Sequence, residues 1–260
     1  MYYTFKILLL SISILITEYT LINTISTKAK IINTDYFEQL YIGKHNTLEK
    51  YNPNGILLSS YSNQSNGEIS AIDVSDPYIL LLFYEDLNRV IFLDDKLAPI
   101  GKPLDLDKLD LFNVSVVCKS KSFAIWIYDR FDNRLIHYGF NPKGIIQEIM
   151  LDPLKLEHEV IFMIESGNHL YLNTGKQVIV LDQYGSFIKS IDSEIKKTLQ
   201  IKNNQIIYFK DNKLLMESIQ EPNTDTLEID FIQGIKHVLI ENNRLFVQKA
   251  DSVFIYEKTD

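Results

Sequence analysis

The chain has 260 residues, of which 46% are hydrophobic, so it can form one cooperative core and is not a disordered chain. Its formal net charge of −8 argues against sequence-independent nucleic-acid binding, which needs a basic stripe, and against adhesion to an anionic membrane surface. Cationic or neutral partners stay open, as does the simpler reading that acidity keeps the protein soluble.

The N-terminal segment is typical of a signal peptide. Lys6 precedes an apolar run over residues 7–16, which Glu18 interrupts. Ten helical residues cover about half of a ~30 Å hydrocarbon layer, which is too little for a spanning helix. Small residues suit a cleavage site after Ser26 or Ala29. We therefore predict a cleaved signal peptide over 1–29, export to the periplasm or cell envelope, and no stable membrane insertion afterwards. An uncleaved anchor is the alternative.

From residue 30 onward, turn signals recur about every 40 residues. One set lies at 35, 76–77, 119–121, 166–168, 203–204 and 242–243, and a second at 45–46, 86–88, 132–133, 174–175, 211–212 and 250–251. The runs between them are rich in Ile, Leu, Val, Phe and Tyr, which are typical of β-strands. Four short strands in ~40 residues are the signature of a propeller blade. We predict an all-β fold, a six-bladed β-propeller in one domain over 30–260.

The predicted strands fall into six groups along the chain. They are 40–43, 47–51 and 56–58; 69–74, 78–84, 89–93 and 100–104; 114–118, 123–128, 135–140 and 145–150; 160–164, 169–172, 177–181 and 186–191; 198–202, 205–209, 213–218 and 226–230; and 237–241, 244–248 and 252–256. The last group lacks a fourth strand, so N-terminal residues must close the ring. Residues 28–33 are available for this, although they could equally be the inner strand of the first blade. Short helical turns are expected around 153–158 or 192–196.

One turn carries a family resemblance. Residues 180–188, Val-Leu-Asp-Gln-Tyr-Gly-Ser-Phe-Ile, resemble the repeat of NHL-type six-bladed propellers, in which a strand runs into Asp-x-x-Gly. Residues 52–56 and 141–145 are looser variants with Asn in the Asp position. Residues 76–88 and 126–129 are similar to signatures of a family of exported, uncharacterised proteins of Bacteroidetes. These resemblances imply the propeller fold and an envelope setting, and carry no activity. The Gly-His and Trp-Asp signatures of WD repeats are absent.

The candidate binding residues lie in two neighbouring turns. In a propeller, the connections between the second and third strands of each blade converge at one mouth of the central channel. In the second and third blades these turns combine aromatic, acidic and Arg side chains: Tyr84, Glu85, Asp86, Arg89, Tyr128, Asp129, Arg130 and Arg134. Such a mixture recognises a polar ligand or peptide through Arg–carboxylate pairs and aromatic stacking. The alternative is solvated turns with internal salt bridges.

No catalytic or metal-binding pattern emerges from the sequence. Cys118, the only cysteine, lies in an apolar strand and is expected to be buried. Trp126 is expected to pack between blades. The five histidines show no zinc-binding spacing, and the acidic clusters do not match a calcium-binding loop. We therefore expect no cofactor and no metal.

Two functional hypotheses follow. The leading one is an exported, non-enzymatic interaction module, expected to be a monomer, that binds an envelope protein or a peptide. The alternative is a six-bladed propeller hydrolase or lactonase, with a metal held by Asp, Asn and Glu side chains in the central channel.

Overall fold

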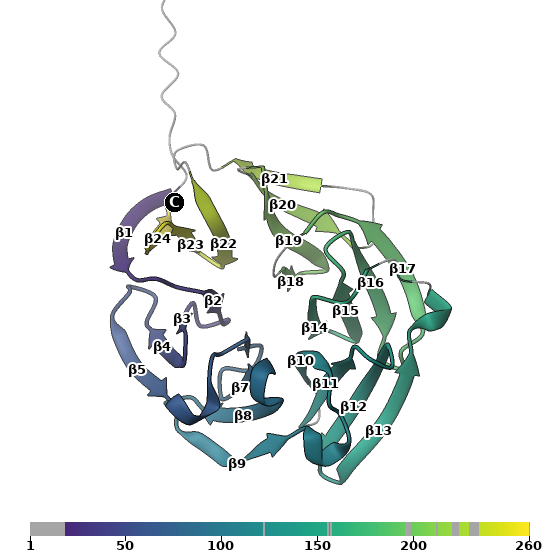
Figure 1. The fold of residues 1–260 in the computed structure, drawn as a ribbon. Helices are drawn as coiled ribbons and strands as arrows, with labels where there is room; N and C mark the ends of the chain where they lie inside the picture. The colour runs from purple at the N-terminus through teal and green to yellow at the C-terminus, as the bar shows by residue number, and fades with distance from the viewer. Residues whose placement is uncertain are drawn as a thin grey trace, which may run out of the picture.

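The structure is a computed structural model that describes residues 19–121, 123–154, 156, 158–195, 199–211, 213–219, 224–228 and 234–259. Six four-stranded antiparallel sheets surround a central axis, with the first strand of each blade innermost (Figure 1). The all-β, six-bladed propeller predicted from the turn spacing is confirmed.

Blades one to five each take four strands in chain order, labelled a to d from the axis outward, and blade six takes its first three strands in this way. Blade one contains β2 (Ile31–Thr34), β3 (Leu40–Lys44), β4 (Thr47–Tyr51) and β5 (Leu57–Ser62); blade two β6 (Ala71–Asp73), β7 (Ile79–Tyr84), β8 (Arg89–Asp94) and β9 (Pro99–Asp105); blade three β10 (Val114–Ser120), β11 (Ala124–Asp129), β12 (Arg134–Phe140) and β13 (Lys143–Met150); blade four β14 (Phe162–Ser166), β15 (His169–Asn173), β16 (Gln177–Asp182) and β17 (Phe187–Asp192); blade five β18 (Gln200–Lys202), β19 (Gln205–Lys210), β20 (Lys213–Ser218) and β21 (Thr224–Glu228); and blade six β22 (Ile235–Glu241), β23 (Arg244–Lys249) and β24 (Ser252–Lys258).

Blade six is completed by the N-terminal strand β1 (Tyr19–Ser26), which pairs antiparallel with β24 (Figure 1). This strand lies inside the segment that the sequence pattern assigned to the signal peptide, so the propeller includes residues 19–26 in addition to the predicted range from residue 30. Residues 28–33 were open to two roles, ring closure or the inner strand of blade one, and the second is observed, since Ile31–Thr34 form β2. The apolar run at 7–16 lies outside the described residues.

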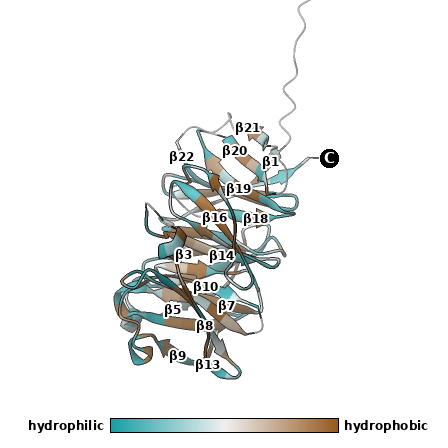
Figure 2. Ribbon diagram, turned by 90° about the vertical axis from the view of Figure 1, so that its right-hand side faces the viewer, coloured by the Kyte–Doolittle hydropathy of each residue, from teal (hydrophilic) through white to brown (hydrophobic). Residues whose placement is uncertain are grey.

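The middle strands are apolar throughout because each blade packs on both faces. In β7, Leu80, Leu82 and Tyr84 point toward blade one, whereas Leu81 and Phe83 point toward blade three. Six buried clusters result, one at each junction between neighbouring blades. The outer strands have one face in water, which gives the alternating exposure of β17. Figure 2 shows hydrophobic stretches along the strands and mostly hydrophilic connections at the two faces.

The predicted Asp-x-x-Gly turn is present between β16 and β17. Asp182 Oδ1 accepts hydrogen bonds from the backbone N–H groups of Tyr184 and Ser186, both at 2.8 Å. Gly185 has φ +79°, a conformation that glycine adopts without a steric penalty. The carboxylate and the glycine together fix this connection.

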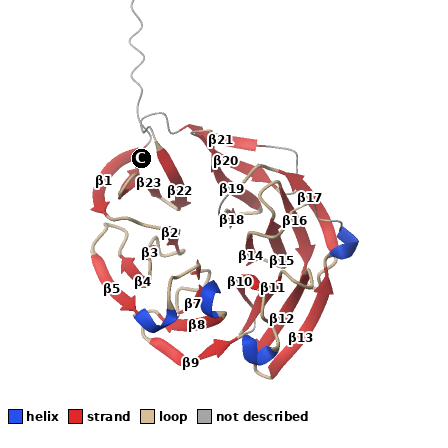
Figure 3. Ribbon diagram, viewed as in Figure 1, coloured by secondary structure: helices blue, strands red, loops and turns tan. Residues whose placement is uncertain are grey.

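Among the described residues, helical structure is confined to four short 3₁₀ turns, drawn in blue in Figure 3: Gln64–Asn66, Glu85–Leu87, Asp107–Leu109 and Asp152–Leu154. The last one lies at the edge of the predicted helical turn over 153–158. The other expected turn is not seen over 192–195, and residue 196 lies outside the described part. In the described ranges, no helix is long and apolar enough to cross a membrane.

Candidate functional site

A cavity of about 950 Å³ follows the central axis. Its wall consists mainly of the inner strands, and it is lined at one end by Ser70 and Ser115 and at the other by Ser75 and Ser166. Apolar side chains such as Phe162 line the part between. The cavity thus has polar ends and an apolar middle, which is the general character of a ligand site.

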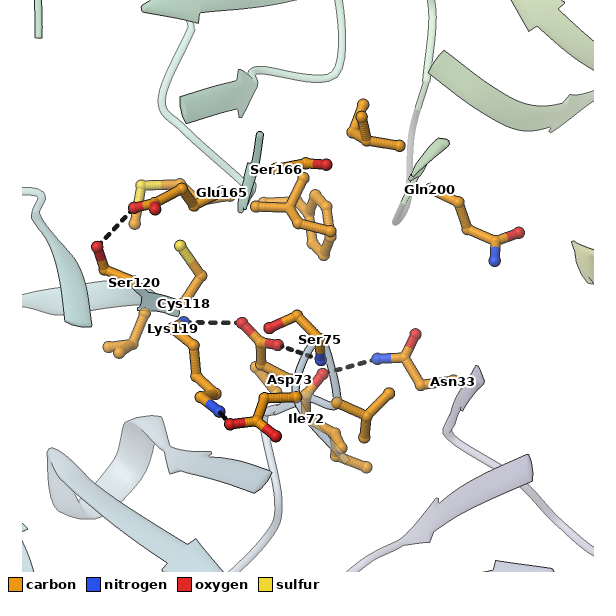
Figure 4. Close-up of a pocket in the computed structure, with 18 of the residues that line it drawn as sticks. Asn33, Ile72, Asp73, Ser75, Cys118, Lys119, Ser120, Glu165, Ser166 and Gln200 are labelled. Atoms are coloured by element: carbon orange, nitrogen blue, oxygen red, sulfur yellow. Dashed lines mark hydrogen bonds and ion pairs between the residues drawn. The ribbon is translucent and has the colours of Figure 1, made fainter. Parts of the chain in front are cut away.

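Many polar groups of this cavity are occupied in contacts between blades (Figure 4). Asn33 Nδ2 donates to the carbonyl of Ile72 at 2.7 Å, joining blades one and two. The backbone N–H of Lys119 donates to Asp73 Oδ2 at 2.7 Å, joining blades two and three. The Lys119 ammonium also lies 3.1 Å from Asp76 Oδ2. These side chains hold neighbouring inner strands together.

A serine, a histidine and a carboxylate meet between blades three and four. Ser120 Oγ donates to Glu165 Oε2 at 2.5 Å, and His137 Nε2 lies 2.9 Å from Ser120 Oγ. Trp126 Nε1 also donates to Glu165 Oε2 at 2.7 Å, and its ring stacks on His137 at 4.2 Å. Burial lowers the pKa of His137, so its imidazole is neutral at pH 7 although Glu165 opposes the shift.

This cluster does not have the order of a catalytic triad. In a triad the imidazole lies between the hydroxyl and the carboxylate, and the carboxylate orients it. Here the Ser120 hydroxyl lies between the other two groups and donates its hydrogen bond to Glu165. Glu165 therefore acts as an acceptor that joins blade four to blade three. The expectation that Trp126 packs between blades is confirmed, since its side chain is 1% exposed.

The junction of blades five and six is held in the same way. Gln200 exchanges two hydrogen bonds with the backbone of Ile240, at 3.0 and 3.1 Å. The Lys202 ammonium lies 2.5 Å from Glu241 Oε1. Burial raises the pKa of Glu241, Lys202 lowers it, and the nearby charges of Asp35 and Glu38 raise it further.

Within the described part of the chain, no three His, Cys, Asp or Glu side chains lie close enough together to hold a metal ion. Cys118 is a free thiol, buried as expected, and burial raises its pKa well above the usual range. A protonated, inaccessible thiol is a poor nucleophile.

The eight predicted binding residues separate into buried and exposed ones. Tyr84, Tyr128 and Asp129 are at most 4% exposed, so they do not contribute to a surface. Arg134 lies 3.1 Å from both Asp129 and Asp132 and 3.0 Å from Glu148. These four belong to the interior of the blade or to its salt bridges.

The exposed members include a salt-bridge chain across three blades. Arg130 contacts Glu85 of blade two at 3.1 Å and Glu159, in the connection to blade four, at 3.2 Å. Asp86 is exposed, and Arg89 is half-buried at the start of β8. The internal salt bridges given as the alternative reading are therefore present, and a binding role for the exposed members stays a prediction.

The sequence reasoning missed three apolar side chains on the same face. Phe131 is 81% exposed, Phe112 66% and Leu87 37%. Leu87 and Phe131 belong to the b–c turns of blades two and three, and Phe112 belongs to the connection between those blades. Each is a large apolar residue inside a turn, and this signal was available in the sequence.

Hydrogen bonds place these three turns side by side. Asn88, the residue after Leu87, donates through Nδ2 to Asp107 Oδ1 at 2.6 Å and to the carbonyl of Leu111. The N–H of Arg130 donates to the carbonyl of Asn113 at 3.0 Å. Phe112 therefore lies between the two b–c turns, and we call Leu87, Phe112 and Phe131 the apolar patch.

No protein-family model and no curated protein sequence matches the chain. The solved structures that share its fold belong to proteins of different kinds. The Pan2 WD40 domain of Neurospora crassa has a TM-score of 0.63 at 10% identity, over 93% of this chain and 96% of that one. Virginiamycin B lyase of Staphylococcus aureus, in a catalytically inactive form with quinupristin, has a TM-score of 0.63 at 11% identity, over 92% of this chain and 99% of that one. BamB of Moraxella catarrhalis has a TM-score of 0.59 at 10% identity, over 92% of this chain and 97% of that one. At these identities the likeness establishes the propeller fold alone, and the function has to be argued from the residues.

Proposed function

We propose that this protein is an exported, non-catalytic interaction module that binds an envelope protein or peptide. The observation that carries the proposal is the apolar patch. Leaving large apolar side chains in water is unfavourable by about 25 cal/mol per Å² of apolar surface. Exposed apolar side chains on neighbouring turns, with charged residues beside them, are typical of a protein-binding surface.

The surroundings of the patch favour a protein partner. Glu85, Arg130 and Glu159 form a charged edge beside the three apolar residues, with side chains 44%, 44% and 63% exposed. Apolar anchors inside a polar rim supply most of the binding free energy in protein interfaces. The b–c turns are anchored to the connection between blades by the hydrogen bonds of Asn88 and Arg130, so little ordering is needed on binding.

The cavity supports a non-catalytic role. Charged groups that could serve as acid, base or metal ligand, including Lys119, Glu165 and Glu241, are engaged between blades. The alternative, a hydrolase or lactonase with a channel metal, needs several oxygen ligands around one point. In the described part of the chain, no three His, Cys, Asp or Glu side chains lie together in this way.

Export also belongs to the proposal, with one change to the cleavage site. Removal after Ser26 or Ala29 would delete β1, which completes blade six. We therefore expect cleavage, where it occurs, before Tyr19. Mass spectrometry of the mature protein tests this: a chain that begins after Ser26 would contradict the retention of β1, and an intact Met1 in a soluble cytoplasmic fraction would contradict export.

The partner site can be tested by site-specific photo-crosslinking in cells. A photoreactive amino acid at position 112 or 131 should capture a defined partner, and one at Tyr184, which is 69% exposed in the c–d turn of blade four, should not. With that partner purified, Phe112→Ser/Phe131→Ser should weaken binding at least ~10-fold, the effect of losing ~2 kcal/mol at an interface anchor. The melting temperature should stay within about 1–2 °C, because both side chains are exposed. Equal capture from all three positions would contradict the proposal.

A further inference from the structure

The opposite mouth of the cavity carries an exposed aromatic cluster. Tyr36 and Phe37, in the a–b turn of blade one, are 51% and 46% exposed, and Tyr78, in the a–b turn of blade two, is 59% exposed. The ring centroids of Tyr36 and Phe37 are 4.4 Å apart, and those of Phe37 and Tyr78 are 6.1 Å apart in an edge-to-face arrangement. Tyr36 also lines the cavity. Residues from the equivalent turns of two neighbouring blades thus form one aromatic surface beside the cavity opening.

The two turns hold these rings in fixed positions. Asp35 Oδ1 accepts the N–H of Phe37, and Asp76 Oδ1 accepts the N–H of Tyr78, both at 2.9 Å. Asn242 of blade six donates through Nδ2 to the carbonyl of Tyr36 at 3.4 Å. The aromatic cluster is therefore supported from both neighbouring blades, and its exposure does not arise from a loose loop.

The electrostatics of this mouth favour a cation. Toward this mouth the cavity is lined by five acidic side chains and three lysines, while a sixth acid, Glu85, lies at the opposite mouth beside Arg130. Each of the three lysines already has an oxygen partner: Lys119 at Asp76, Lys121 at Asn168 and Lys202 at Glu241. The excess is negative, and Asp76, whose side chain is 43% exposed, lies in the turn that carries Tyr78. Burial, Tyr78 and the charges of Asp76 and Asp35 together raise the pKa of Tyr36.

We propose that Tyr36, Phe37 and Tyr78, with the carboxylate of Asp76, form a binding site for an organic cation. A guanidinium or ammonium group is attracted to the faces of aromatic rings, and the surplus of carboxylates adds to this attraction. A neutral sugar would also stack on the rings but would gain nothing from the negative charge. The cation has two sources, a basic side chain of a peptide or a free quaternary ammonium compound. This site is separate from the apolar patch and does not depend on it.

Calorimetric titration at low ionic strength tests this site. The probes are choline and an acetylated, amidated pentapeptide, Gly-Arg-Gly-Lys-Gly, with a matched peptide in which Gln replaces Arg and Lys. Binding of the basic peptide alone identifies a peptide source, and binding of choline alone identifies a small cation. The affinity for whichever probe binds should fall several-fold when the salt concentration rises from about 20 to about 200 mM. No binding of either probe at millimolar concentration, or equal binding of the Gln peptide, would overturn the proposal.

Substitutions separate the rings from the charge. Tyr36→Ala/Tyr78→Ala should weaken cation binding about 10-fold, whereas Tyr36→Phe/Tyr78→Phe should retain it because the ring faces remain. Asp76→Asn should weaken cation binding several-fold, although the amide oxygen can still accept the hydrogen bond from the N–H of Tyr78. It serves as the second variant if the double Ala protein is unstable. Tyr184→Ala removes an equally exposed ring elsewhere and should have no effect. Unchanged affinity in the double Ala and Asp76→Asn proteins would place the cation elsewhere and refute the assignment.

Discussion

The closure of the ring by β1 gives the sharpest test of the fold. Seven residue pairs join β1 to β24, from Tyr19–Lys258 to Ser26–Ser252. Only Tyr19 is a buried side chain within this strand, at 8% exposure, and it packs in the cluster between blades five and six with Val238, Leu245 and Tyr256. The neighbouring Leu21 is 48% exposed. β1 is therefore held by its backbone pairing, by Tyr19, by the partly buried Ile25 at the junction of blades six and one, and by the hydrogen bond from Asn23 Nδ2 to the carbonyl of Asn54 at 2.7 Å.

The effect of removing that side chain follows from its burial. Replacing a buried aromatic residue by Ala lowers the free energy of unfolding by about 3 kcal/mol. For a domain of this size each kcal/mol lowers the melting temperature by about 2–4 °C. We therefore expect Tyr19→Ala to lower it by about 6–12 °C, and Leu21→Ala by no more than about 2 °C. Thermal unfolding followed by circular dichroism measures both.

Truncation extends the same test to the whole strand. A chain that begins at Thr27 loses all seven pairs and exposes the edge of β24. Exposed strand edges promote association, so this protein should melt lower than Tyr19→Ala and aggregate on concentration. Equal melting temperatures for the truncated and full chains, or for Tyr19→Ala and Leu21→Ala, would show that β1 does not close the ring.

The architecture could be predicted because its signals are local. A turn such as that at Asp182 and Gly185 depends on a side-chain oxygen acceptor and a positive φ within a few residues, and related turns begin at Asn52 in blade one and at Asp94 in blade two. Continuous apolar runs follow from packing on both faces of each blade. Local chemistry therefore yields the number of blades and most strand positions.

Ring closure was not predictable in this way. Residues 19–26 follow an apolar run and contain small residues, so they resemble the end of a signal peptide. Their partner, β24, lies more than 220 residues away along the chain, and no local pattern records that pairing.

The candidate site was predictable only in part. Strand alternation already places Tyr84 with Leu80 and Leu82, and Tyr128 with Trp126, so their burial follows from a period of two. The salt bridges of Arg130 join three blades, and the aromatic cluster of Tyr36, Phe37 and Tyr78 joins two. Contacts between blades depend on the geometry of the ring, which sequence spacing does not give.

Two further predictions concern the junction between blades three and four. Glu165→Ala leaves the Trp126 indole N–H and the Ser120 hydroxyl without their acceptor, so the free energy of unfolding in guanidinium chloride should fall by about 2–3 kcal/mol. Glu159→Ala, at an exposed salt bridge, should change the free energy of unfolding by less than about 1 kcal/mol. Equal losses of stability in the two variants would show that Glu165 does not join the blades. At the same junction, burial raises the pKa of the Cys118 thiol, so the thiol stays protonated through pH 7–9. Because the thiolate is the reactive form, a disulfide reagent should label the native protein only as fast as it unfolds, and Glu165→Ala should speed labelling. Fast labelling of the stable protein below pH 8 would show that Cys118 is accessible and ionised, and would contradict the packing described between these blades.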